Sequence, residues 1–98
     1  MKDFTCHIAV LMVTLFIPSA QSLKSKRMVL KSLKDRIRSQ FNVSVSELDS
    51  QDKWQLAVCG MVQIGNDKRY LNSCLENILK FMEHFHDFEI NDHEIFFL

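Results

Sequence analysis

Positive charge is concentrated in one short stretch of this 98-residue chain. Between Lys24 and Arg38 there are seven lysines and arginines and one acid, Asp35, although the whole chain has no net charge. At the 100° per residue of an α-helix, several of these cations fall on one stripe. The stripe consists of Lys24, Arg27, Lys31, Lys34 and Arg38. A basic stripe of this kind has the chemistry to bind a phosphate backbone, with little sequence specificity.

The sequence therefore predicts a surface that binds structured RNA. The predicted nucleic-acid-binding residues are Lys24, Lys26, Arg27, Lys31, Lys34 and Arg38. Lys24 and Arg27 are the preferred candidates, because they fall in the first helical turn, where the helix dipole disfavours positive charge unless an anion offsets it. The alternative is that the lysines and arginines only solvate a surface helix and bind nothing.

A second polar group lies between Glu47 and Gln55. Its three carboxylates have the chemistry to bind a hard cation or to share a proton as an acid and base pair. A structural role is favoured, because Asp49 and Asp52 are good turn-forming and capping residues and Glu47 can pair with a nearby cation. We expect Trp54 to anchor the sheet, either to a helix or to a dimer surface.

Histidines near the C-terminal end are the nearest approach to a metal cluster. The residues concerned are His84, His86 and His93, with Asp87 and Glu94. On a continuous helix His84 and His86 would point in different directions, so shared chelation requires the helix to end by Glu83. We expect no functional metal site, no cofactor, no catalytic residue and no enzymatic activity.

Composition indicates a single domain over residues 1–98. Hydrophobic residues make up 47% and charged residues 24%, and two glycines and one proline leave little room for linkers. The cysteines Cys6, Cys59 and Cys74 are odd in number and lack a CxxC spacing. This pattern favours a reduced, cytoplasmic protein.

The apolar run from Ile8 to Ile17 imitates a secretory signal, since Pro18, Ser19 and Ala20 follow it. We interpret it as a buried strand, because it is rich in β-branched residues and Asp3 weakens the positive charge before it. The run is also shorter than the roughly 20 apolar residues that span a membrane, so no membrane association is expected.

Hydrophobic periodicity predicts the order strand, helix, strand, strand, helix, strand. The predicted strands are Phe4–Phe16, Val43–Leu48, Trp54–Ile64 and Phe88–Phe97. One helix is predicted from Leu23 to about Gln40 with Ser22 as its cap, and the other from a cap at Asn66 or Asp67 to about Phe85. This βαββαβ order indicates an α+β, ferredoxin-like sandwich, in which two helices cover one face of a four-stranded antiparallel sheet.

The central strands are apolar on both faces. On the third strand, Leu56, Val58 and Val62 point one way, and Ala57, Cys59 and Met61 point the other way. Because the helices cover only one face, the other needs a partner, and a sheet-to-sheet homodimer is the simplest. A homodimeric protein-interaction module is therefore the alternative function.

Two segments carry a family resemblance. Residues 17–27 have the form IPxxxSLKxKR, and residues 41–55 have the form FNVSVxExDxxDxWQ. With these segments the chain resembles the YlxP-like family of small bacterial proteins, a domain of unknown function. The resemblance implies a ferredoxin-like fold and a strand, not a signal, at the N-terminus. Genes of this family often lie beside those for translation initiation factor 2 and a ribosome-binding factor, which implies a ribosome-associated role.

Overall fold

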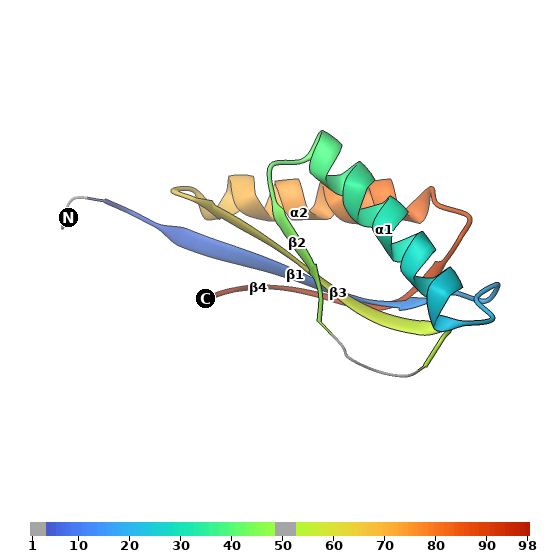
Figure 1. Cartoon of the computed structure of the whole chain (residues 1–98). Helices are drawn as coiled ribbons and strands as arrows, with labels where there is room; N and C mark the ends of the chain where they lie inside the picture. Colours follow the sequence, from blue (N-terminus) through green and yellow to red (C-terminus); the bar gives the residue numbers. More distant parts are fainter. Residues whose placement is uncertain (1–3, 49–52) are drawn as a thin grey trace.

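The computed structural model describes residues 4–48 and 53–98. The elements are β1 (His7–Phe16), α1 (Leu23–Gln40), β2 (Ser44–Glu47), β3 (Leu56–Gly65), α2 (Lys68–Glu83) and β4 (Glu89–Phe97). The strands form one antiparallel sheet in the order β2-β3-β1-β4. Figure 1 shows α1 and α2 on the same face of this sheet. The predicted α+β, ferredoxin-like βαββαβ fold is confirmed.

The predicted element boundaries lie within three residues of those in the structure. The largest difference is at the first strand, which was predicted from Phe4 and begins at His7. His7 pairs with Gly65, the last residue of β3, so the residues before His7 have no partner on that side. The extent of the neighbouring strand therefore limits β1, as a ladder needs hydrogen-bonding partners.

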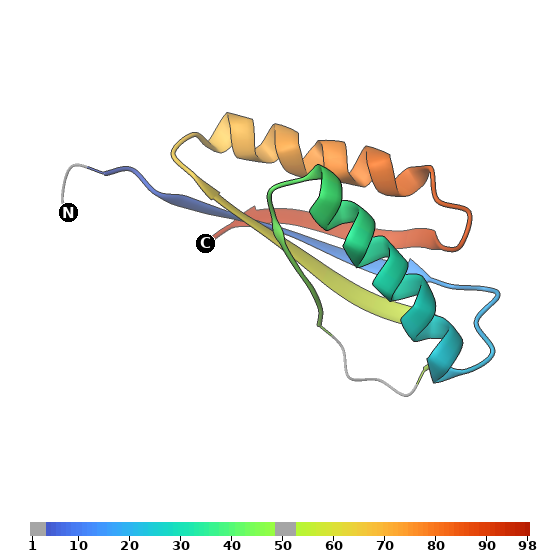
Figure 2. The ribbon, with the colours of Figure 1, turned by 45° about the horizontal axis from the view of Figure 1, so that its top comes forward.

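The core lies between the helices and the inward face of the two central strands. From β1 and β3 it receives Ala9, Leu11, Val13, Leu15, Ala57, Cys59 and Met61. From the helices it receives Leu30, Leu33, Ile37, Leu71, Leu75, Ile78 and Met82. Figure 2 shows the two helices lying across this face of the sheet. Burial of each large side chain stabilises the fold by about 1.5–3 kcal/mol.

No described element covers the other face of the sheet (Figures 1 and 2). On β3, Val62 and Ile64 are 37% and 67% exposed there, and Met12 of β1 is half-buried. The prediction that the helices cover only one face of the sheet is therefore confirmed. Neither α1 nor α2, the helices of the described part, combines the length and the apolar character needed to cross a lipid bilayer.

Candidate nucleic-acid interface

Helix α1 begins at a capping box. The backbone N–H of Ser25 donates to Ser22 Oγ at 3.1 Å, and the backbone N–H of Ser22 donates to Ser25 Oγ at 3.2 Å. The predicted Ser22 cap is thereby confirmed. No acidic residue lies in the first turn. The positive end of the helix dipole thus lies close to Lys24, in the first turn, and Arg27 follows at the start of the second turn.

The buried stripe of α1 determines where its cations lie. Because Leu30, Leu33 and Ile37 face the core, the neighbouring basic stripe occupies one flank of the helix. On this basic flank Lys34 is half-buried and the other side chains are exposed; its residues are Lys24, Arg27, Lys31, Lys34 and Arg38. The Arg38 guanidinium donates from Nη2 to the Val45 carbonyl of β2 at 3.1 Å. The basic flank therefore runs along the β2 edge of the sheet.

Two cations of helix α1 lie outside the basic flank, Arg36 and the buried Lys26. The Arg36 guanidinium lies 5.0 Å from the ring centroid of Phe85, beyond the end of α2. A cation over an aromatic ring is attracted by the negative ring face. Arg36 therefore helps to hold the helices together on the side away from β2.

Within the described residues, Asp35 is an acid that lies beside the basic flank. The Lys31 ammonium donates to Asp35 Oδ2 at 2.9 Å, and this hydrogen bond, followed by the positive charge of Lys31, lowers the pKa of Asp35. Both side chains are more than half exposed. An exposed pair one helical turn apart contributes little stability, so it leaves Lys31 able to exchange Asp35 for another anion.

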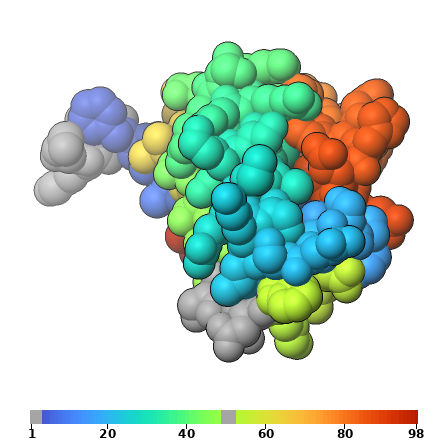
Figure 3. Space-filling view, turned by 45° about the vertical axis from the view of Figure 1, so that its right-hand side comes forward, coloured from blue at the N-terminus to red at the C-terminus, as the bar shows by residue number. Residues whose placement is uncertain are grey.

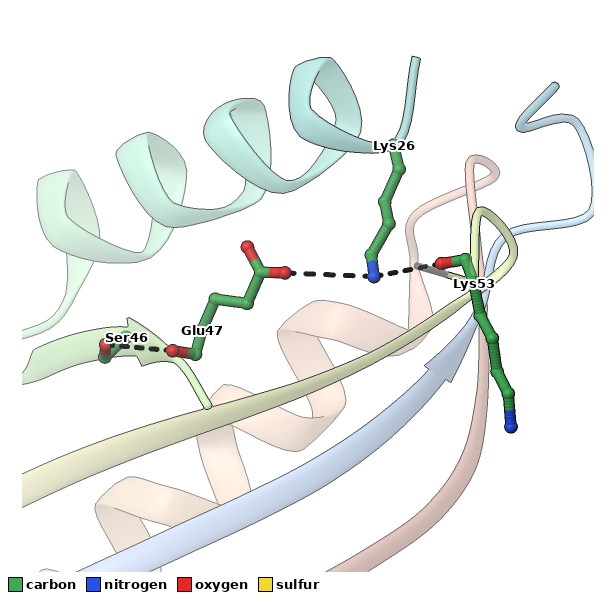
Figure 4. Close-up of polar contacts among 4 residues, drawn as sticks. All are labelled: Lys26, Ser46, Glu47 and Lys53. Carbon is green, nitrogen blue, oxygen red and sulfur yellow. Dashed lines mark hydrogen bonds and ion pairs between the residues drawn. The ribbon is translucent and has the colours of Figure 1, made fainter. Parts of the chain in front are cut away.

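The side chain of Lys26 lies between α1 and the sheet and not on the exposed side of the helix. Its residue is 2% exposed, and its ammonium donates to the Lys53 carbonyl at 3.1 Å and lies 3.8 Å from Glu47 Oε1. Figure 4 shows the Lys26 side chain reaching from α1 between these two groups, while the Lys53 side chain points away. Of the six residues predicted to bind RNA, Lys26 is thus the one that is buried, and it is not part of the exposed basic surface.

The sequence contained a signal for this burial. Lys26 precedes Leu30 by four residues and Leu33 by seven, so it falls within the apolar stripe of the helix. The sequence pattern could not supply the partners, since Glu47 and Lys53 come from a distant part of the chain. The expectation that Glu47 pairs with a cation is confirmed.

The two segments that carry the family resemblance meet at one end of the molecule. Besides the Lys26 contacts, the Ile17 N–H donates to the Gln55 carbonyl at 2.7 Å. The Gln55 side chain donates from Nε2 to the Pro18 carbonyl at 3.1 Å. These contacts attach the loop before α1 to the chain before β3. Asp49 and Asp52 lie outside the described residues.

Trp54 is not buried against a helix, so of its two predicted roles the contact with a dimer surface stays a prediction. It is 51% exposed and precedes β3, since the last β1 to β3 pair is Phe16 with Leu56. Sequence reasoning missed the feature that lies beside it, a shallow hollow with Trp54 on its wall. The lining residues are Phe16, Lys53, Trp54, Gln55 and Leu56. No sequence signal marks this hollow, because it depends on where the pairing of β1 with β3 ends.

The C-terminal histidines begin at the end of α2. Helix α2 ends at Glu83, and His84 Nδ1 lies 2.7 Å from the Lys80 carbonyl. Within residues 4–48 and 53–98, no three His, Cys, Asp or Glu side chains are placed to hold one metal ion. The arrangement of His84 is that of a helix end.

Comparisons with known proteins agree on a family and on a fold. A family model described as "Protein of unknown function (DUF503)" matches residues 8–95. The "Uncharacterized protein YlxP" of Bacillus subtilis (strain 168) is 37% identical over 73 residues, covering 74% of this chain and 79% of that protein. A solved structure, "De novo designed protein Foldit4", matches with a TM-score of 0.53 and 16% identity, over 94% of this chain and 96% of the designed one. The designed protein shows the fold alone.

Proposed function

The chain belongs to the DUF503 family of proteins of unknown function, and we propose that it is a non-catalytic module that binds the phosphate backbone of structured RNA through α1. The gene neighbourhood that the YlxP-like resemblance implies makes ribosomal RNA the proposed partner and the cytoplasm the proposed location. The proposal rests on the exposed basic flank of α1. Because phosphate contacts carry little sequence information, affinity should depend on charge and on RNA shape.

The observation that carries this proposal is the separation of charge across the sheet. The basic flank lies along β2, at one edge, and β4 forms the opposite edge. Exposed acids gather at the end of α2, on the chain that follows it and on β4; they are Glu83, Asp87, Glu89, Asp92 and Glu94. One side of the molecule therefore attracts a polyanion and the other repels it, so a nucleic acid has one favourable orientation.

The test is binding to small ribosomal subunits and to an isolated RNA hairpin at low and physiological salt. We expect the double variant Lys24→Glu, Arg27→Glu to lose at least about tenfold in affinity, and the slope of log K against log salt to fall by about two. The matched control is Arg69→Glu, Lys80→Glu, which changes net charge equally on exposed positions of α2. Equal losses in both variants, or salt-independent binding, would contradict the proposal.

A second candidate is a homodimeric interaction module that uses the open face of the sheet. The observation in its favour is the exposure of Val62 and Ile64 on that face. Sedimentation should then show a dimer at micromolar concentration. The double variant Val62→Asp, Ile64→Asp should dissociate this dimer. The control Met28→Asp, at an exposed site on α1, should leave it intact. A monomer at that concentration would exclude this candidate.

A further inference from the structure

We propose that the hollow beside Trp54 binds one unpaired nucleobase of the RNA whose backbone lies on α1. This inference rests on the proposed function. It adds that the bound RNA has an unpaired nucleotide next to a duplex. A contiguous ligand would place phosphates on the basic flank and stack one base on the indole of Trp54. The module would then prefer a junction between duplex and single strand over a continuous duplex.

The hollow has the groups that an unpaired base requires. Trp54 is half exposed, and Phe16 and Leu56, the last pair of the β1 to β3 ladder, add apolar side chains to the lining. Unpaired bases in protein complexes stack on such aromatic side chains and hydrogen-bond through their edges. The carboxamide of Gln55 lines the same hollow and is held in place by its bond to the Pro18 carbonyl. It can offer its oxygen to a base edge.

The backbone on both sides of Trp54 is fixed. The carbonyl of Lys53 accepts from the buried ammonium of Lys26, and the carbonyl of Gln55 accepts from the Ile17 N–H at 2.7 Å. The indole is therefore exposed on a platform attached both to α1 and to the end of β1. Because the backbone on both sides of Trp54 is already ordered, binding of a base need not order this segment, which favours binding.

Charge connects the hollow to the basic flank. Lys53 lines the hollow and is exposed, and its side chain points away from Lys26 (Figure 4). Figure 3 shows the first turns of α1, the loop before it and the segment around residues 53–56 as neighbouring parts of one end of the molecule. The hollow therefore lies at the same end of the molecule as Lys24 and Arg27, and Lys53 adds a positive charge to its lining. This continuity favours a nucleic acid over an uncharged ligand.

Trp54 is the single tryptophan of the chain, so its fluorescence reports on the hollow alone. The probes are two RNA hairpins with the same stem, one blunt and one with a short single-stranded overhang. We expect both to bind, but only the overhang hairpin to bind more tightly and to quench Trp54. The variant Trp54→Leu should lose about 5- to 150-fold in affinity for the overhang hairpin, the range that removal of one stacked base gives. Its affinity for the blunt hairpin should be unchanged.

The control is Tyr70→Leu, which removes another exposed aromatic ring, on α2, and should leave both affinities unchanged. Trp54→Phe should restore part of the lost affinity. Equal binding of both hairpins without quenching would overturn this inference and leave the proposed function intact. Binding of neither hairpin would overturn both. A Trp54 signal that changes with protein concentration in the absence of RNA would assign the hollow to a protein contact and overturn the inference.

Discussion

The ammonium of Lys26 lies 3.8 Å from Oε1 of Glu47, beneath the first turns of α1. The Lys26 side chain is 3% exposed, whereas that of Glu47 is 29% exposed. A buried ammonium requires hydrogen bonds and an opposite charge, because loss of its hydration costs several kcal/mol. The two residues come from the two segments that carry the family resemblance. This contact therefore fixes α1 over β2 and gives the family segments a structural role.

Removal of either partner should have unequal effects on stability. In Lys26→Met the side-chain stem stays packed and Glu47 is left where water reaches it, so we expect a loss within about 1 kcal/mol. In Glu47→Leu the buried ammonium loses a carboxylate, and we expect a loss of about 1–3 kcal/mol. Urea unfolding measures both values. A larger loss for Lys26→Met than for Glu47→Leu would contradict this account.

Substitution at the α1 cap should separate stability from RNA binding. Ser22→Ala removes the oxygen that accepts from the Ser25 N–H and should cost about 1 kcal/mol. Ser22→Asp retains an acceptor and adds a favourable charge at the helix N-terminus, so stability should be held or raised. That same charge lies beside Lys24, so the aspartate variant should bind RNA less tightly. Thermal unfolding and RNA titration test the pair together, and tighter RNA binding by Ser22→Asp would refute the prediction.

The two glycines of β3 should tolerate alanine differently. A Cβ on Gly60 would lie 2.8 Å from Leu48 Cδ1, but Leu48 is 52% exposed and its tip can move outward. A Cβ on Gly65 would lie 3.1 Å from Leu71 Cδ2, in a side chain that is 1% exposed. We expect Gly60→Ala to change stability by less than about 0.5 kcal/mol and Gly65→Ala to cost about 1–3 kcal/mol. The denaturant midpoints of the two variants show which one is less stable.

The contribution of Tyr70 to folding stability should depend on pH in the alkaline range. Its hydrogen bond with the Cys74 side chain, followed by the negative charge of the Cys74 thiolate, raises the pKa of Tyr70. Since the folded-state pKa lies above the unfolded one, the stabilisation is present at neutral pH and is lost as pH rises through the folded pKa. In Cys74→Ala the pKa of Tyr70 should fall. Tyr70 is the single tyrosine, so tyrosinate absorbance measures it directly, and an unchanged midpoint would exclude the hydrogen bond.

The order of elements and the position of α1 could be predicted because both depend on local patterns. The apolar spacing of Leu30, Leu33 and Ile37 and the cap at Ser22 are contained within α1 and its first neighbour. The same spacing indicated where Lys24 and Arg27 would lie, on the flank beside the buried stripe. The fold could be predicted because segments with the periodicity of strands and segments with the periodicity of helices alternate along the chain. Few arrangements of such segments bury all the apolar faces.

The sequence by itself thus determined the elements, their caps and the segregation of charge along the chain. Only the tertiary structure decided which charges share a surface. It buried Lys26 against Glu47, and it exposed Trp54 beyond the last pair of β1 and β3. It also placed the acids of β4 at the sheet edge opposite the basic flank. These relationships join residues far apart in sequence, and they arise from strand order and packing, which no local pattern of residues contains.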